Sequence, residues 1–174
     1  MKKIFLAFTF LIGLTTAFAQ SNLKFAHVDY ANVVDSLPSK LAADKEMKTF
    51  IDDSQKTLQE LQTLLERDYE IYMAAKDSLS AISKEIKERK LTEQQMDLQR
   101  KQERTQQDLE TYNERLYTPI EKSFKKAVKT VSQKYKLNYV FETGSLLYLE
   151  GGMDISAEVK TEIIRLEKIR LGEG

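Results

Sequence analysis

The sequence predicts a predominantly helical α+β fold, in which a small β-strand body carries a long antiparallel α-helical hairpin. No Gly or Pro occurs between Pro38 and Pro119, and this segment is rich in Lys, Glu, Gln, Leu and Ala. Such a composition is typical of long helices. Apolar residues recur every seven positions within the segment, as in a coiled coil. Short runs of β-branched and aromatic residues flank it on both sides and predict strands.

Residues 1–19 have the organisation of a secretory signal peptide. Lys2-Lys3 precedes an apolar run from Ile4 to Leu14, and Ala17 to Ala19 supplies small residues before a cleavage site. The apolar run is shorter than the roughly 20 residues that cross a bilayer. We therefore expect a cleaved signal and a mature chain outside the cytoplasm, with no transmembrane segment after signal removal.

Residues 20–38 are predicted to begin the body. The segment Lys24–Asp29 alternates in side-chain character and predicts a strand. Tyr30–Asp35 predicts a helical turn that Asp29 caps at its N-terminus. Pro38 ends this stretch, because the residue before a proline avoids the α-helical region.

Residues 39–118 are predicted to form the helical hairpin. One apolar series runs through its first half, at Ile51, Leu58, Leu65, Tyr72, Leu79 and Ile86. A companion series has two polar interruptions and comprises Met47, Ser54, Leu61, Asp68, Ala75 and Ile82. Together these two series form the a/d seam of a coiled coil. An apolar stripe of this length needs a partner helix to bury it.

The chain reversal is predicted near residues 90–92. Thr92 and Gln95 have the spacing of a capping box, which would start the second helix. The segment Gln99–Asp108 contains no apolar residue, so we expect the two arms to pair well near the body and less well toward the tip. The alternative is one continuous helix of about ninety residues in a parallel coiled coil.

Residues 119–174 are predicted to complete the body with a helix, two strands and a last helix. Pro119 would restart or kink the helix. The segments Leu137–Glu142 and Leu146–Glu150 predict two strands of a hairpin, with Thr143-Gly144-Ser145 as its loop. A final amphipathic helix carries Val159 and Ile163. Because an isolated two-stranded hairpin is unstable in water, we expect the two ends of the mature chain to meet in one body.

The composition argues against an enzyme. The formal net charge is zero, which gives no field for nucleic acid. The chain has no Cys, and His27 is its single histidine, so no catalytic or metal-binding partner is available to it. Gly151-Gly152 lacks the lysine of a phosphate-binding loop. We expect no catalytic residues, no metal and no cofactor.

Several short segments resemble the Skp (OmpH-type) family of periplasmic chaperones. They are Phe25–Asp29 (FAHVD), Pro119-Ile120 with Ala127-Val128, Leu137–Glu142 (LNYVFE), and Asp154-Ile155-Ser156 with Val159. The resemblance extends over the mature chain. It implies a homotrimer whose three hairpins, or tentacles, surround a cavity. Such an assembly would hold unfolded outer-membrane β-barrel proteins without ATP.

Two functions remain open from the sequence: a holdase chaperone, and a structural coiled-coil spacer or scaffold of the cell envelope. A spacer needs fully matched heptads, so the polar stretch favours the holdase. Client contacts are predicted at Tyr69, Tyr72, Leu79, Ile82 and Ile86, although packing between the arms would explain them equally well. A basic stripe could make weak contacts with a membrane surface or with acidic clients, unless it is simply the solvated side of a helix. It comprises Lys122, Lys125, Lys126 and Lys129.

Overall fold

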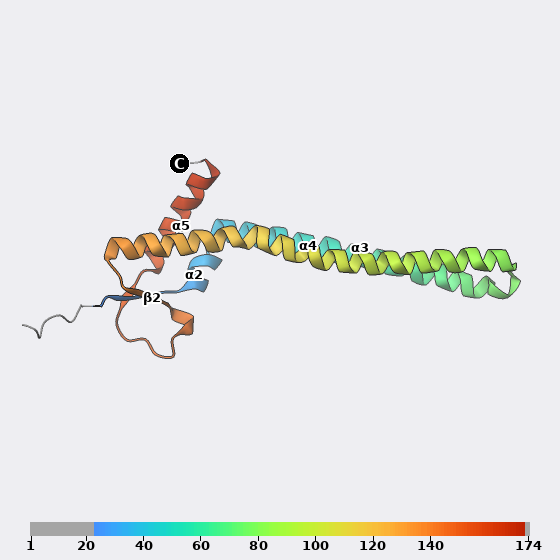
Figure 1. Ribbon diagram of the computed structural model, residues 1–174, viewed down its shortest axis with the longest axis horizontal. Coiled ribbons are helices and arrows are strands. Elements are labelled where there is room, and N and C mark those ends of the chain that lie inside the picture. Colours follow the sequence, from blue (N-terminus) through green and yellow to red (C-terminus); the bar gives the residue numbers. More distant parts are fainter. Residues whose placement is uncertain (1–22, 173–174) are drawn as a thin grey trace, which may run out of the picture.

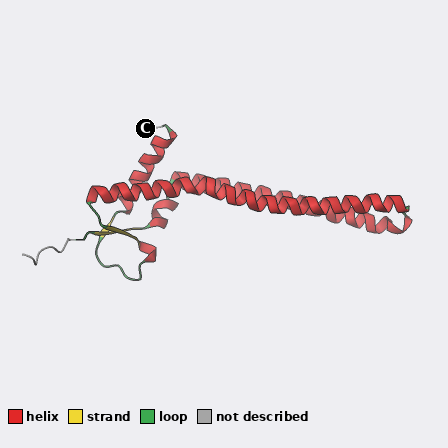
Figure 2. Cartoon of the chain, in the orientation of Figure 1, coloured by secondary structure: helices red, strands yellow, loops and turns green. Residues whose placement is uncertain are grey.

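A computed structural model describes residues 23–172, and the predicted signal peptide lies outside them. Figures 1 and 2 show a long helical hairpin that projects from a small body at one end. The elements in chain order are β1 (Phe25–Val28), α2 (Tyr30–Asp35), α3 (Pro38–Ala75), the 3-10 turn η1 (Lys76–Ser78), α4 (Ala81–Tyr135), β2 (Tyr139–Glu142), the 3-10 turn η2 (Thr143–Ser145), β3 (Met153–Asp154) and α5 (Ser156–Leu171). The predicted fold class is confirmed.

The two ends of the described chain meet in a parallel sheet of order β2-β1-β3. Phe25 lies beside Tyr139, and His27 lies beside Phe141 on one side and Asp154 on the other. The Asn138 side chain accepts a hydrogen bond from the Lys24 amide at 2.9 Å, and the Ile155 amide donates to the His27 carbonyl at 3.0 Å. The central strand therefore comes from one end of the mature chain and both of its neighbours come from the other.

The predicted strand at Leu146–Glu150 and the predicted β-hairpin are wrong. In this structure β2 and β3 both run parallel to β1, so the chain must return to the far end of the sheet between them. Leu146–Glu150 lies on that return path and pairs with no strand of the described chain. The sequence identifies residues that favour β-structure. Whether such residues pair parallel or antiparallel depends on β1, which lies far away in the sequence.

The core of the body lies where α2, α4 and α5 meet the sheet. Leu37, Ile155, Val159 and Ile163 have no exposed surface. Figure 1 shows that α5 crosses α4 and that its C-terminal end then stands away from the hairpin. Asp29 caps α2 as predicted, accepting a hydrogen bond from the Asn32 amide at 2.9 Å.

The buried carboxylate of Glu167 lies at the start of α3. That helix begins at Pro38 after Leu37 and has no side-chain cap of its own. Glu167, which is 7% exposed, accepts a hydrogen bond from the Ser39 hydroxyl at 2.8 Å. A negative charge near a helix N-terminus is stabilising, because the helix dipole places partial positive charge there. An α5 side chain therefore helps to anchor the first arm on the body.

The predicted reversal near residues 90–92 is wrong, and the continuous-helix alternative is also excluded. The chain turns between Lys76 and Ser80, and residues 90–92 lie inside α4. Ser80 is the true N-cap, with its side chain accepting from the Ser83 amide. The Thr92 hydroxyl donates back to the Glu88 carbonyl at 2.9 Å, as a hydroxyl in a helix interior can. Its apparent capping box therefore starts no helix.

The helix also continues through Pro119, so of the two predicted outcomes, a restart or a kink, the restart is wrong. Ile120, directly after it, is 3% exposed and belongs to the body core. α4 ends at Tyr135, and Lys136 adopts a left-handed conformation with φ 55°. One helix therefore serves as both the second arm of the hairpin and a wall of the body.

The two arms stay in contact out to the reversal, which corrects the expectation of a poorly paired tip. The rings of Phe50 and Tyr112 stack with centroids 4.4 Å apart. Farther out, Asp68 occupies the seam with its side chain 15% exposed. Gln94 and Lys90 of α4 donate to its carboxylate at 2.9 and 3.0 Å. Polar contacts therefore replace apolar ones near the tip.

We expect Asp68→Asn to loosen the outer end of the hairpin. The hydrogen bonds from Gln94 and Lys90 hold the pKa of Asp68 down, to about 2. The group is therefore charged at neutral pH, and its contribution is lost only as pH falls from about 4 toward 2. The neutral amide should raise amide hydrogen exchange between residues 64 and 94 on the order of tenfold, while the body is unchanged.

Asp97→Asn is the matched control, because Asp97 is exposed and bonds only to Arg100 of its own helix. It should leave exchange at the tip unchanged. Equal exchange in the wild type and in Asp68→Asn would show that the carboxylate does not hold the arms together.

Candidate functional site

Large apolar side chains stand exposed along the outer half of the hairpin. These residues, which we call the tip surface, are Leu64, Tyr69, Ile71, Met73, Ile82, Ile86 and Met96. Their exposed fractions reach 72% at Ile82. Single exposed apolar residues are ordinary, whereas a contiguous exposed patch of them commonly marks a binding surface. The tip surface is the largest set of exposed apolar residues on the hairpin.

Of the five residues predicted to contact clients, three are exposed in the structure and two are not. Tyr69, Ile82 and Ile86 are exposed by 52%, 72% and 54%. Leu79 is half-buried, and Tyr72 is 4% exposed. The heptad count placed Ile82 and Ile86 in the seam of the first arm. Because the chain reverses before them, they lie instead on the outward side of α4.

Tyr72 packs between the arms and offers no free surface. Its hydroxyl donates a hydrogen bond to the Glu88 carboxylate of α4. That bond to a carboxylate raises the pKa of Tyr72 to about 12, so the phenol stays protonated at any ordinary pH. The contact joins the two arms three residues before the end of α3, which makes Tyr72 a structural residue.

Four members of the tip surface were missed: Leu64, Ile71, Met73 and Met96. Leu64, Ile71 and Met73 lie directly beside the predicted seam residues Leu65 and Tyr72, and Met96 lies on α4 beyond the end of the predicted seam. Apolar residues at such positions have no partner helix to cover them. A count of apolar residues at positions outside the seam would have found Ile71 and Met73, because they stand directly beside the seam residue Tyr72.

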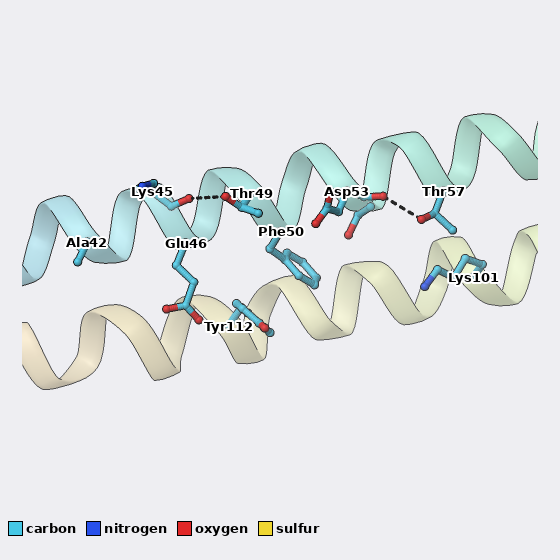
Figure 3. A pocket seen from close by; sticks show the side chains of 10 residues that line it. Ala42, Lys45, Glu46, Thr49, Phe50, Asp53, Thr57, Lys101 and Tyr112 are labelled. Atoms are coloured by element: carbon cyan, nitrogen blue, oxygen red, sulfur yellow. Dashed lines mark hydrogen bonds between the residues drawn. The ribbon is translucent and has the colours of Figure 1, made fainter.

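An open groove of about 560 Å³ lies between the arms nearer the body (Figure 3). The groove follows α3 from Ala42 to Thr57, the stacked rings of Phe50 and Tyr112 lie within this length, and Lys101 of α4 lies near its outer end. Between them α4 presents half-buried Thr105 and Asp108 to the seam. The polar stretch Gln99–Asp108 lacks the bulky side chains that would fill this space. This polar stretch therefore lies in the middle of the hairpin and not at its tip.

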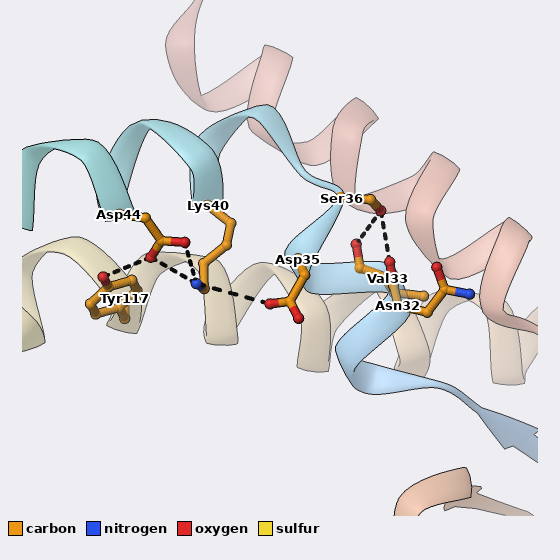
Figure 4. A network of polar contacts seen from close by, with 7 residues as sticks. All are labelled: Asn32, Val33, Asp35, Ser36, Lys40, Asp44 and Tyr117. Atoms are coloured by element: carbon orange, nitrogen blue, oxygen red, sulfur yellow. Dashed lines mark hydrogen bonds and ion pairs between the residues drawn. The ribbon is translucent and has the colours of Figure 1, made fainter. Parts of the chain in front are cut away.

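Polar contacts join the first arm to the body (Figure 4). Lys40 of α3 lies 2.6 Å from Asp44 on the same helix and 3.9 Å from Asp35 of α2. The Tyr117 hydroxyl of α4 donates to Asp44 at 2.8 Å. The hydrogen bond from Lys40 lowers the pKa of Asp44. This network fixes the direction in which the hairpin leaves the body.

A second exposed apolar area covers one face of the body. Phe25, Tyr139 and Phe141 stack on each other with centroid distances of 5.6 to 6.3 Å and are 41% to 52% exposed. Leu147 and Tyr148, on the return path between β2 and β3, are exposed by 107% and 76%. We call the three stacked rings the aromatic face.

Within residues 23–172, no three side chains of the His, Cys, Asp and Glu types lie close enough to hold a metal ion. Over the same range, no helix combines the length and apolar character that a membrane span requires.

Comparisons with known proteins identify the family of this chain. The model of the OmpH-like outer membrane protein family matches residues 24–163. An uncharacterised protein of Aquifex aeolicus (strain VF5) is 30% identical over 168 residues, which are 94% of this chain and 96% of that protein. A crystal structure from Caulobacter crescentus CB15, described as a candidate OmpH-like outer membrane chaperone, matches with a TM-score of 0.71 at 18% identity, covering 83% of this chain and 85% of that one. The chain therefore belongs to the OmpH-like family.

Proposed function

We propose that the mature chain is a non-enzymatic, ATP-independent holdase chaperone of the periplasm that binds unfolded outer-membrane β-barrel proteins. Residues 39–118 form its tentacle, and residues 20–38 and 119–174 form its body. The tip surface is the observation that carries the proposal. Family membership supports it, and so does the description of the Caulobacter crescentus protein as a candidate chaperone.

The tip surface suits the holding of an unfolded chain. Each apolar contact contributes on the order of 1 kcal/mol, so no single one fixes the client. Several arms around one client raise the effective concentration of these contacts, and the sum gives retention without a closed site. Because each contact is weak, the client stays mobile and can be released without a nucleotide.

A structural spacer is the second candidate, and two observations disfavour it. The seam of α4 contains Lys101, Thr105 and Asp108, where a matched heptad seam would have bulky apolar residues, and the groove of Figure 3 lies beside this stretch. A spacer also gains nothing from isoleucines exposed by 54% and 72%. Both features cost stability in a rigid rod, whereas both are useful in a surface that binds unfolded chains.

The body is proposed to assemble a homotrimer through the aromatic face. Three large rings at half exposure would be buried against neighbouring copies. The outer edges of β2 and β3 carry unpaired backbone groups, which strands of another copy could satisfy. Leu146–Glu150 has the composition of a strand and could become one by pairing between chains.

Removing the outer part of the hairpin should abolish holding and leave the body assembled. The pairs Phe50–Tyr112 and Glu46–Arg115 show which positions face each other. Replacing residues 54–108 by a Gly-Ser link therefore cuts both arms at the same level. The truncated protein should no longer prevent aggregation of a urea-denatured outer-membrane protein, measured by light scattering. Full protection by the truncated protein would overturn the tentacle mechanism.

Point substitutions at the tip surface should weaken holding without unfolding the hairpin. The triple variant Tyr69→Ser, Ile82→Ser, Ile86→Ser removes exposed side chains only, so the melting curve by circular dichroism should change little. We expect client affinity to fall about tenfold or more, since three contacts of about 0.5 kcal/mol or more are lost. Glu85→Ser with Glu93→Ser, exposed polar residues of the same helix, is the control and should bind normally. Equal binding by both variants would remove the tip surface from the mechanism.

The trimer can be tested at the aromatic face. Light scattering on the mature wild type should report three chains. Tyr139→Ser with Phe141→Ser should shift the mass toward one chain, since both rings are about half exposed in the single chain and their loss should spare its fold. Leu64→Ser, on the hairpin, should leave the mass unchanged. A monomeric wild type, or a trimer that survives the double change, would contradict this interface.

A further inference from the structure

A basic groove lies between α4 and α5, outside the surfaces described above. Pro119, Lys122, Ser123 and Lys126 form one wall, and the second wall consists of Arg165, Leu166, Ile169 and Arg170. The wall on α4 follows helical spacing, with residues three, four and seven positions after Pro119. The groove has a volume of about 640 Å³. It opens because α5 crosses α4 and then leaves it (Figure 1).

Positive charge dominates this groove. Each wall contributes two cations, whereas the chain as a whole has no net charge. Of the α5 carboxylates, Glu162 is already paired, because Arg165 donates to both of its oxygens at 2.6 and 2.7 Å. From Tyr117 to Tyr135, α4 carries five lysines against the single glutamate Glu121. The groove is therefore complementary to an anion.

Apolar side chains lie between these cations. Pro119 and Leu166 are half-buried, and Ile169 is 56% exposed. Residues 119–126 of α4 extend over roughly 10 Å at 1.5 Å per residue. That length fits three or four residues of an extended chain at about 3.3 Å each. A suitable ligand has one large apolar side chain with carboxylates on both sides.

The second wall belongs to a part of the chain that the family does not define. The match to the OmpH-like family ends at residue 163, and all four residues of the α5 wall follow it. The structure also divides the basic stripe. Lys122 and Lys126 line the groove, whereas Lys125 and Lys129 do not.

We propose that this groove binds a short acidic segment of a partner protein, with an apolar side chain against Leu166 and Ile169 and carboxylates against the four cations. Arg165 is held in place by Glu162, and a fixed guanidinium is well suited to a carboxylate. The groove is concave, so a flat bilayer surface cannot reach its floor. This binding is independent of client holding at the tip surface.

The test uses the full mature chain and fluorescein-labelled 12-residue peptides with Leu, Ile or Phe at the centre and Asp and Glu on both sides. Fluorescence anisotropy should show saturable binding that weakens with added salt. Lys122→Glu with Lys126→Glu should weaken it about tenfold or more, since two favourable charge contacts become unfavourable. Peptides with Asn and Gln in place of Asp and Glu should not bind.

The control is Lys125→Glu with Lys129→Glu, which makes the same change in charge on the same helix but outside the groove. It should change affinity less than twofold. Ile82→Ser with Ile86→Ser should also leave peptide binding intact, which separates this site from client holding. The proposal is overturned if none of the peptides binds, or if both lysine pairs weaken binding equally. It is also overturned if the groove lysines govern binding to phosphatidylglycerol vesicles but not to the peptides.

Discussion

The parallel pairing of β1 with β2 and β3 is the constraint on which the rest of this structure depends. The middle strand of the sheet comes from the start of the mature chain, and both of its partners come after residue 138. The residues between β1 and β2 must therefore leave the body and return to it. A stretch without Gly or Pro can do so only as long helices, and two antiparallel helices bury each other's apolar stripes. The hairpin is therefore the connection that this sheet requires.

The hairpin changes character along its length. At the base, the buried carboxylate of Glu167 and the Lys40 network tie it to the body. In the middle, the polar residues of the second arm leave a groove between the arms. Near the tip, Asp68 and Tyr72 hold the arms together by hydrogen bonds, so the apolar residues around them are free to face solvent. Contacts that stabilise the rod are thus separate from the surface available to a client.

Apolar and charged groups are distributed so that three separate surfaces of the chain differ in chemistry. The aromatic face of the sheet is apolar and suits other copies of the chain. The tip surface is apolar but dispersed over two helices, which suits ligands without fixed structure. The groove between α4 and α5 combines cations with a small apolar floor, and suits a short defined segment. A near-zero net charge conceals this division, because it reports the sum of the charges and not their positions.

The sequence by itself determined the strand at residues 24–29, the Asp29 cap, the break before Pro38, the heptad seam and the meeting of the two chain ends. Each is a local pattern, or an apolar surface that must be buried. It could not determine the reversal between Lys76 and Ser80, because no Gly or Pro marks it and heptad spacing continues across it. The misplaced reversal put Ile82 and Ile86 in the seam of the first arm. The heptad count also could not show that Tyr72 is covered. Only the tertiary structure decided these points and the direction of the strands, because periodicity identifies which side of a helix is apolar but not where its partner begins.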